Sequence, residues 1–168
     1  HGVFLYDATT RVPLLISHPS LQQGLVVGKV NSVVDVAPTV LGLLGQPVPA
    51  ELDGVALGPV LTGEAQLPDR LVYSESLQPA DELGWADLRA VRSSDVRYIR
   101  APRAEIYGLN QDPNELVDFS AEAAEQMQQL ETELAALLAE GEVSERRASA
   151  PAPFAIADAE RSDPKDAM

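Results

Sequence analysis

The sequence predicts a mixed α/β fold of the α+β type, in which a short α/β portion precedes a small antiparallel sheet covered by a helix. Three patterns predict it. Residues 11–19 contain a short apolar run bounded by Pro13 and Pro19, which is typical of a buried sheet strand. Four short segments with strand character follow between residues 71 and 109. Residues 120–140 then carry apolar side chains at helical spacing.

The first helix is predicted over residues 35–45. Asp35 suits the N-cap because its carboxylate can accept hydrogen bonds from the free N–H groups of the first turn. Pro38 is tolerated in that turn, and Gly45 can end the helix. The apolar stripe consists of Val40, Leu41 and Leu44. A loop follows, with a short helical turn expected near Leu57–Leu61.

The antiparallel sheet is predicted from short strands joined by tight links. The predicted strands are Leu71–Leu77, Asp87–Arg92, Val96–Ala101 and Glu105–Leu109. A helix over residues 120–140, with Ser120 as its N-cap, should pack one face on this sheet. That face consists of Ala123, Met127, Leu130, Leu134, Leu137 and Leu138.

Changes in composition divide the chain into three parts. Residues 1–63 form the α/β portion, and residues 64–141 form the antiparallel subdomain. Residues 142–168 offer few side chains for a core, which predicts a flexible linker or tail. The sequence begins at His1 without an initiator methionine or an apolar leader, so we expect a cut or processed piece of a longer protein.

The chain is acidic, and this limits its partners. Its 168 residues carry a formal charge of -14, which disfavours binding to nucleic acid. An anionic ester would need a local metal or cationic pocket to offset that charge. No run approaches the roughly 18 apolar residues of a membrane span. The absence of cysteine excludes disulfides, thiolate metal sites and a cysteine nucleophile within this chain.

Seven short elements occur in a characteristic order. They are His1–Ile16 with its Arg11-Val-Pro13, Val33–Gly45 with its Asp35-Val-Ala-Pro38-Thr39, Leu52–Leu57, Tyr73–Glu75, Val96–Ile99, Glu105–Tyr107 and Asp112–Glu115. Together they resemble the sulfatase family, although Ala56 replaces the serine of the family's Asp-Gly-x-Ser-Leu loop. Residues 73–101 look most like bacterial sulfatase-like proteins that continue into tetratricopeptide repeats, and Asp163-Pro-Lys-Asp resembles the junction before such repeats.

The resemblance implies the alkaline-phosphatase-like α/β fold. Residues 1–63 would then end its large parallel-sheet domain, and residues 64–141 would be its smaller antiparallel subdomain. The parent protein would hydrolyse sulfuric esters at a divalent metal, calcium or else zinc or manganese. In such enzymes the nucleophile and the main metal ligands precede the point where this chain starts. We therefore expect the chain alone to hold no metal and to catalyse nothing. Many such proteins are exported, so the bacterial periplasm or the extracellular space is plausible.

Other interpretations stay open. The substrate could be a phosphoric or phosphonic ester of the same superfamily. The chain could instead belong to a pseudoenzyme or to a non-catalytic interaction module that uses the acidic helix 120–140. An upstream nucleophile motif with an Asp-His or Asp-Asn pair would favour the enzyme, whereas downstream helical repeats of about 34 residues would favour the module. The oligomeric state is not predicted.

His1 is the candidate catalytic residue. It stands ten positions before Arg11. Many sulfatases have a lysine at a similar spacing that contacts the transferring group, and nearer relatives have His followed by Gly. An imidazole there could bind the metal, hydrogen-bond an ester oxygen or protonate the leaving group. Alternatively, His1 is only a frayed terminal residue of this chain.

The other polar residues favour structural roles. Arg11 is expected to form a buried ion pair with Asp7 or Asp35, and His18 to lie in a loop. Trp85, the only tryptophan, is expected to pack in the subdomain core, with a place on a substrate-facing rim as the alternative. Two acidic residues of the segment after the last strand should make turn and cap hydrogen bonds. They are Asp112 and Glu115.

Overall fold

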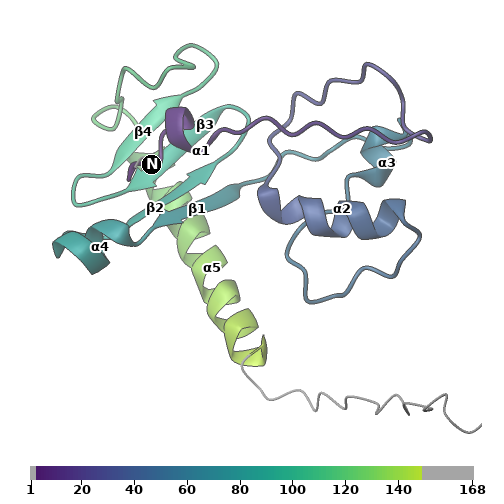
Figure 1. Ribbon diagram of the computed structural model, residues 1–168. Helices are drawn as coiled ribbons and strands as arrows, with labels where there is room; N and C mark the ends of the chain where they lie inside the picture. The colour runs from purple at the N-terminus through teal and green to yellow at the C-terminus, as the bar shows by residue number, and fades with distance from the viewer. Residues whose placement is uncertain (1–2, 149–168) are drawn as a thin grey trace, which may run out of the picture.

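The structure, a computed structural model, describes residues 3–148 (Figure 1). Its centre is a four-stranded antiparallel sheet in the order β1-β2-β3-β4. The strands are β1 (Val72–Ser76), β2 (Leu88–Arg92), β3 (Val96–Arg100) and β4 (Glu105–Gly108). Strands that follow one another in the chain are also neighbours in the sheet. This confirms the predicted sheet, with only small differences at the strand ends.

The two faces of the sheet bury different partners, because side chains alternate along each strand. One face packs on the N-terminal segment (residues 4–10) through the cluster Leu5, Ala90, Ile99, Tyr107 and Leu109. The other packs on α5 (Ala124–Ala148) through the cluster Val91, Tyr98, Ile106, Leu130 and Leu134. Figure 1 shows α1 (Asp7–Thr10) and α5 on opposite sides of the sheet. This arrangement confirms the predicted α+β class.

The ends of α5 differ from the predicted ones. Asp118 accepts hydrogen bonds from both the N–H and the hydroxyl of Ser120, each at 3.0 Å, so Ser120 belongs to a turn before the helix begins at Ala124. The helix continues past residue 140 to Ala148, because Glu, Arg and Ala are good helix formers even after the apolar stripe ends at Leu138. The rest of the predicted tail, residues 149–168, lies outside the described residues.

A second group of helices lies beside the sheet in Figure 1. It contains η1 (Val33–Asp35), α2 (Val36–Leu43) and α3 (Gly58–Leu61). The predicted helix is confirmed, and Gly45 follows its end in the left-handed conformation (φ 65°). The predicted cap is right in position but not in its bonding, because Asp35 stands at the N-cap of α2 and its side chain makes no capping hydrogen bond to that helix. Ser32 caps η1 through its hydroxyl, and the Asp35 carboxylate reaches back to the Ser32 N–H, which completes a capping box.

The strand predicted within residues 11–19 is not present in this structure. The segment is extended but belongs to no ladder, and three of its apolar side chains are exposed: Val12 by 61%, Leu14 by 44% and Leu15 by 87%. A strand exists only through hydrogen bonds to a neighbour, and no described segment pairs with this one. Its apolar side chains instead border a hollow of about 380 Å³ that α3 lines on the other side.

We predict that the isolated chain self-associates through residues 12–15. An extended apolar segment with unpaired backbone groups is a template for pairing with a second copy. Light scattering after size exclusion should show oligomers for the unchanged chain and a larger monomer fraction for the variant Val12→Ser/Leu15→Lys. Leu116→Lys is the control, because Leu116 is 79% exposed but lies after β4. A monomeric unchanged chain at about 50 µM would contradict this expectation.

Candidate functional site

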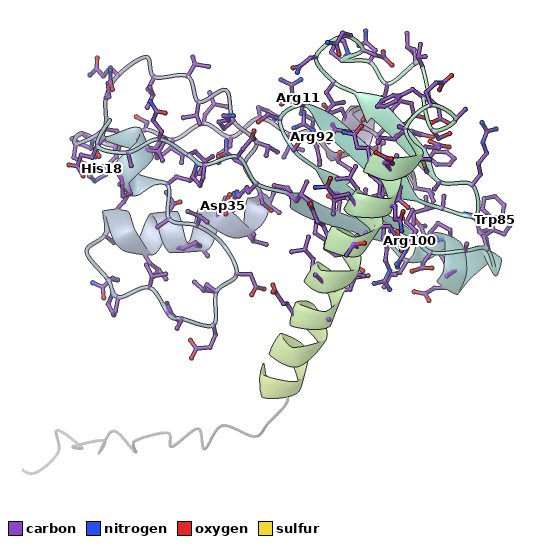
Figure 2. All side chains as sticks on the ribbon, turned by 180° about the vertical axis from the view of Figure 1, so that it is seen from behind. Arg11, His18, Asp35, Trp85, Arg92 and Arg100 are labelled. Atoms are coloured by element: carbon purple, nitrogen blue, oxygen red, sulfur yellow. The ribbon has the colours of Figure 1, made fainter. Side chains whose placement is uncertain are left out.

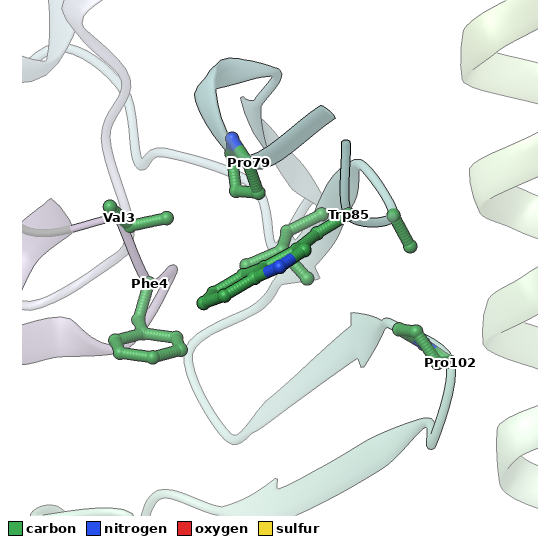
Figure 3. A pocket seen from close by; sticks show the side chains of 7 residues that line it. Val3, Phe4, Pro79, Trp85 and Pro102 are labelled. Carbon is green, nitrogen blue, oxygen red and sulfur yellow. The ribbon is translucent and has the colours of Figure 1, made fainter. Parts of the chain in front are cut away.

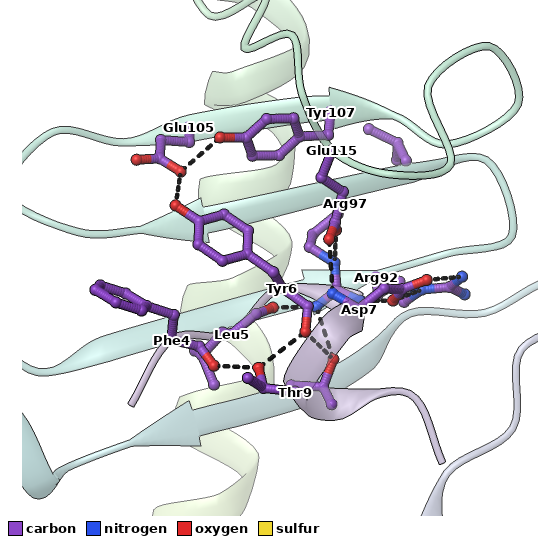
Figure 4. A network of polar contacts seen from close by, with 12 residues as sticks. Phe4, Leu5, Tyr6, Asp7, Thr9, Arg92, Arg97, Glu105, Tyr107 and Glu115 are labelled. Atoms are coloured by element: carbon purple, nitrogen blue, oxygen red, sulfur yellow. Dashed lines mark hydrogen bonds and ion pairs between the residues drawn. The ribbon is translucent and has the colours of Figure 1, made fainter. Parts of the chain in front are cut away.

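Arg97 of β3 fastens the N-terminal segment to the sheet (Figure 4). Its side chain is 1% exposed. The guanidinium donates hydrogen bonds to the Leu5 carbonyl oxygen, the Asp7 carboxylate and Thr10 Oγ1, the last at 3.2 Å. Arg97 Nε lies 2.5 Å from Glu115 Oε1, in an ion pair whose angles fall outside those of a hydrogen bond. One buried side chain therefore joins the start of the chain, β3 and the loop after β4.

Asp7 and Glu115 balance two arginines in this cluster. Arg92 of β2 donates two hydrogen bonds to the Asp7 carboxylate, from Nε at 3.0 Å and from Nη2 at 3.2 Å. Glu115 Oε2 accepts the Asp7 N–H at 2.6 Å. Burial lowers the pKa of Arg97, and the charges of Glu115 and Asp7 oppose that shift. Burial also raises the pKa of Glu115, against the hydrogen bond from the Asp7 N–H and the charge of Arg97. The cluster is thus a buried, nearly neutral set of charges.

Glu115 is also unusual in its backbone, which takes the left-handed conformation at φ 56°. That conformation is uncommon for a residue with a Cβ and persists only where surrounding contacts hold it. The expected turn role is confirmed for Asp112, whose carboxylate accepts the Val117 N–H at 2.8 Å. The expected cap role is also confirmed for Glu115, whose carboxylate accepts the N–H of Asp7, the first residue of α1, and in addition pairs with Arg97.

Two tyrosines reinforce the attachment of the N-terminal segment. The hydroxyls of Tyr6 and Tyr107 both donate to Glu105 Oε2, at 2.8 and 2.7 Å, and their rings meet edge to face with centroids 6.0 Å apart. Burial and the neighbouring Glu105 carboxylate raise the pKa of both phenols, because each hydroxyl is bonded to a negative charge. Tyr6 therefore anchors the segment by a polar tip as well as an apolar ring.

Trp85 lines an apolar pocket against the start of the chain (Figure 3). The pocket measures about 210 Å³. Its walls are Val3, Phe4, Pro79, Trp85, Ala86, Leu88 and Pro102. Trp85 follows α4 (Gln78–Leu83), a helix that the sequence did not predict and that ends at Gly84 in the left-handed conformation (φ 66°). The indole is 65% exposed, so the expected core packing is wrong, and a place on a substrate-facing rim stays a prediction.

The sequence-predicted polar residues do not meet in one place. His1 lies outside the described residues, two positions before Val3. Arg11 is exposed and forms no ion pair among the side chains of residues 3–141, because Arg92 and Arg97 take Asp7. His18 is exposed and its Nδ1 lies 2.7 Å from Ser20 Oγ. Figure 2 shows His18 and Trp85 at opposite ends of the molecule.

Asp35, the last residue of η1, is fully buried in a second polar cluster against the loop before α3. Its carboxylate accepts the N–H groups of Ser32 and Val55, both at 2.8 Å, and forms an ion pair with Arg70. Burial alone would raise the pKa of Asp35, but the bonds from Arg70 and the two amides outweigh it and lower the pKa. Thr39 Oγ1 accepts the Leu57 N–H at 2.9 Å and so ties the same loop to α2.

The described residues do not form a metal centre. No group of three or more His, Asp or Glu side chains within that part of the chain could hold an ion. The carboxylates of Asp7, Asp35 and Glu115 each face an arginine, so they lack the free charge that a divalent cation needs. None of the helices described for residues 3–148 has the length and hydrophobicity that a membrane span requires.

Sequence reasoning missed the Arg97 cluster, although one signal was present. Arg97 stands inside a strand whose neighbours Val96, Tyr98 and Ile99 are apolar or aromatic. A charged residue at an inward position of a central strand requires a buried counter-charge. The local sequence does not predict which residue provides this counter-charge, because Asp7 and Glu115 are distant from Arg97 in the chain.

The chain belongs to the family described as N-sulphoglucosamine sulphohydrolase, C-terminal, whose sequence profile matches residues 2–143. The fold and the profile therefore define the C-terminal region of a sulfatase. Arylsulfatase K of Bos taurus is 28% identical in an alignment of 146 positions that covers 80% of this chain and 26% of that protein. The chain thus spans about a quarter of the length of that curated relative.

Solved structures share the fold. A candidate sulfatase of Bacteroides thetaiotaomicron VPI-5482 superposes with a TM-score of 0.69 at 23% identity, covering 88% of this chain and 33% of that one. A second structure, solved in complex with its substrate D-glucosamine-2-N,6-O-disulfate, superposes with a TM-score of 0.50 at 27% identity and covers 68% of this chain and 24% of that one. The profile match confirms the expected family, and these superpositions confirm the expected fold.

Proposed function

We propose that this chain is the C-terminal part of a metal-dependent sulfuric ester hydrolase. The family match over residues 2–143 carries the proposal, and the short span relative to known sulfatases supports it. The divalent metal and the nucleophile would come from upstream residues, because the described residues do not fit a metal. We also propose that residues 1–63 form the end of the catalytic domain, residues 64–141 the antiparallel subdomain and residues 142–168 a linker. In the complete protein, a repeat domain would follow this chain, and the protein would be exported.

The contribution of this chain would be one wall of the substrate cleft. His1 precedes Val3 and Phe4, which line the pocket with Trp85. The exposed rings of Phe4 and Trp85, together with the exposed Pro102, offer an apolar surface on which the C–H face of a sugar ring can lie. A relative of this fold binds a disulfated glucosamine. We therefore infer a sulfated sugar as the substrate, with His1 near the ester and Trp85 against the ring.

The proposal is tested by hydrolysis with the complete protein. Nitrophenyl sulfate and 6-O-sulfated glucosamine should release sulfate, and a chelator should abolish the release. The isolated chain should release none, because it lacks the nucleophile. Faster turnover of a phosphate or phosphonate ester would favour the alternative substrate class. No turnover by a protein whose upstream part lacks a nucleophile motif would favour the pseudoenzyme or interaction module.

Trp85→Ala in the complete protein should raise KM for the sulfated sugar about tenfold, equivalent to about 1.4 kcal/mol, with kcat nearly unchanged. The ring would bind ground state and transition state alike, so its loss affects binding. Leu83→Ala is the matched control, because Leu83 is 51% exposed in the same region but does not line the pocket. Equal KM values for the two variants would remove Trp85 from the substrate site.

A further inference from the structure

Arg97 is a charged residue buried in the centre of the sheet, at a position where an apolar side chain would be expected. An apolar residue of similar size at such a position often gives equal or greater stability, because a buried charge must be desolvated. The exposed fraction is 1%, and carboxylates already occupy its donors, so Arg97 does not bind an anionic substrate itself. The gain from this arginine must therefore lie in what its bonds hold in place.

Those bonds converge on a segment that has little rigidity of its own. The helix α1 spans Asp7–Thr10 only, and its N-cap residue Tyr6 makes no capping bond through its side chain. A helix this short is unstable without tertiary contacts. Arg97 donates a hydrogen bond to the Leu5 carbonyl oxygen, and Glu115 accepts one from the Asp7 N–H at 2.6 Å. The backbone path from residue 5 to residue 7 is thus set by the buried charges.

That path continues directly into the pocket. Leu5 is followed toward the N-terminus by Phe4 and Val3, which face Pro79 and Trp85 across the pocket in Figure 3. The strained backbone of Glu115 (φ 56°) is a second, independent sign that this cluster is held under constraint. Figure 4 shows the cluster and Phe4 on the same stretch of chain.

We propose that Arg97 is a positioning residue: by fixing the N-terminal segment through Leu5, Asp7 and Glu115, it holds the Val3–Phe4 wall of the pocket opposite Trp85, where the sulfated sugar would lie. This inference rests on the proposed function. Because this wall would bind ground state and transition state alike, its displacement should raise KM and leave kcat nearly unchanged.

The test uses the complete protein and a pair of variants that separate position from stability. Arg97→Met alone leaves Glu115 as an unpaired buried charge, so this single variant should have a lower melting temperature than the unaltered protein. Arg97→Met/Glu115→Gln removes both charges, keeps an amide oxygen that can accept the Asp7 N–H, and should regain most of the melting temperature. Arg100→Met is the matched control, because Arg100 lies on the same strand, is 35% exposed and pairs with Glu131 of α5 at 3.3 Å.

Two measurements are made on each variant: hydrogen exchange of residues 3–10, and kcat and KM for a sulfated glucosamine. The double variant should exchange these amides at least tenfold faster and raise KM about tenfold, with kcat nearly unchanged. Arg100→Met should change neither the exchange nor KM. Unchanged exchange in the double variant, or faster exchange with an unchanged KM, would overturn the proposal.

The measurements also separate this inference from the proposed function. An unaltered complete protein that hydrolyses no sulfate or phosphate ester would sink the proposed function, and the positioning role would fall with it. Hydrogen exchange would still decide by itself whether Arg97 anchors residues 3–10. Turnover by the unaltered protein with an unaffected double variant would leave the proposed function intact and reject only the role of Arg97.

Discussion

Asp35→Asn is expected to lower the free energy of unfolding at pH 7 by about 3 kcal/mol, the lower end of the range for breaking a buried ion pair. The carboxylate accepts two backbone N–H groups and pairs with Arg70. An amide keeps one acceptor and turns an NH₂ group toward donors, so at least one backbone N–H loses its partner. Arg70 is 19% exposed and can reach water, which keeps the cost from being larger.

The same variant should change the acid sensitivity of the protein. The folded pKa of Asp35 is lowered, whereas an unfolded aspartate titrates near about 3.9. Its stabilising contribution is therefore complete above the unfolded pKa and is lost as the pH falls through the folded pKa. Urea unfolding of the complete protein at pH 7 and below pH 3 should show the two proteins converging in acid. The exposed Asp53→Asn is the control and should stay within about 0.5 kcal/mol. A constant difference at both pH values would contradict this account.

Gly54→Ala should destabilise the protein by about 2–4 kcal/mol, because there is no room for a methyl group. A Cβ at this position would overlap the carbonyl oxygen of Val34 and lie 2.9 Å from the Asp35 Cα atom. Both neighbours are backbone atoms, so the loop must move away. That movement would break the bond from the Val55 N–H to Asp35.

The comparison for Gly54 is Gly42→Ala in α2. A Cβ there meets nothing within 4 Å, and alanine is the better helix former by about 1 kcal/mol. Calorimetry of the complete protein should therefore show a lower melting temperature for Gly54→Ala and an equal or higher one for Gly42→Ala. Similar melting temperatures for both variants would mean that the close approach at Gly54 relaxes at little cost.

Local patterns predicted the elements whose partners lie near them in the chain. The hairpins around β2 and β3 follow from short links, and the stripe with Leu130 and Leu134 predicted the packing of α5. The run at residues 11–17 failed as a strand because strand character depends on a neighbour, and no described segment supplies one. Trp85 was expected in the core because a single tryptophan is usually buried. The local sequence does not show that it follows α4 at an exposed position.

By itself the sequence determined the α+β class, the sulfatase resemblance and the absence of cysteine chemistry, because periodicity, motif order and composition are properties of short stretches. Only the tertiary structure decided which charges meet. Arg97 forms ion pairs with Asp7 and Glu115, and Asp35 forms one with Arg70, although these partners lie far apart in the sequence. Burial makes these pairings obligatory, since a charge removed from water needs a counter-charge, but the chain path alone determines which residue provides it.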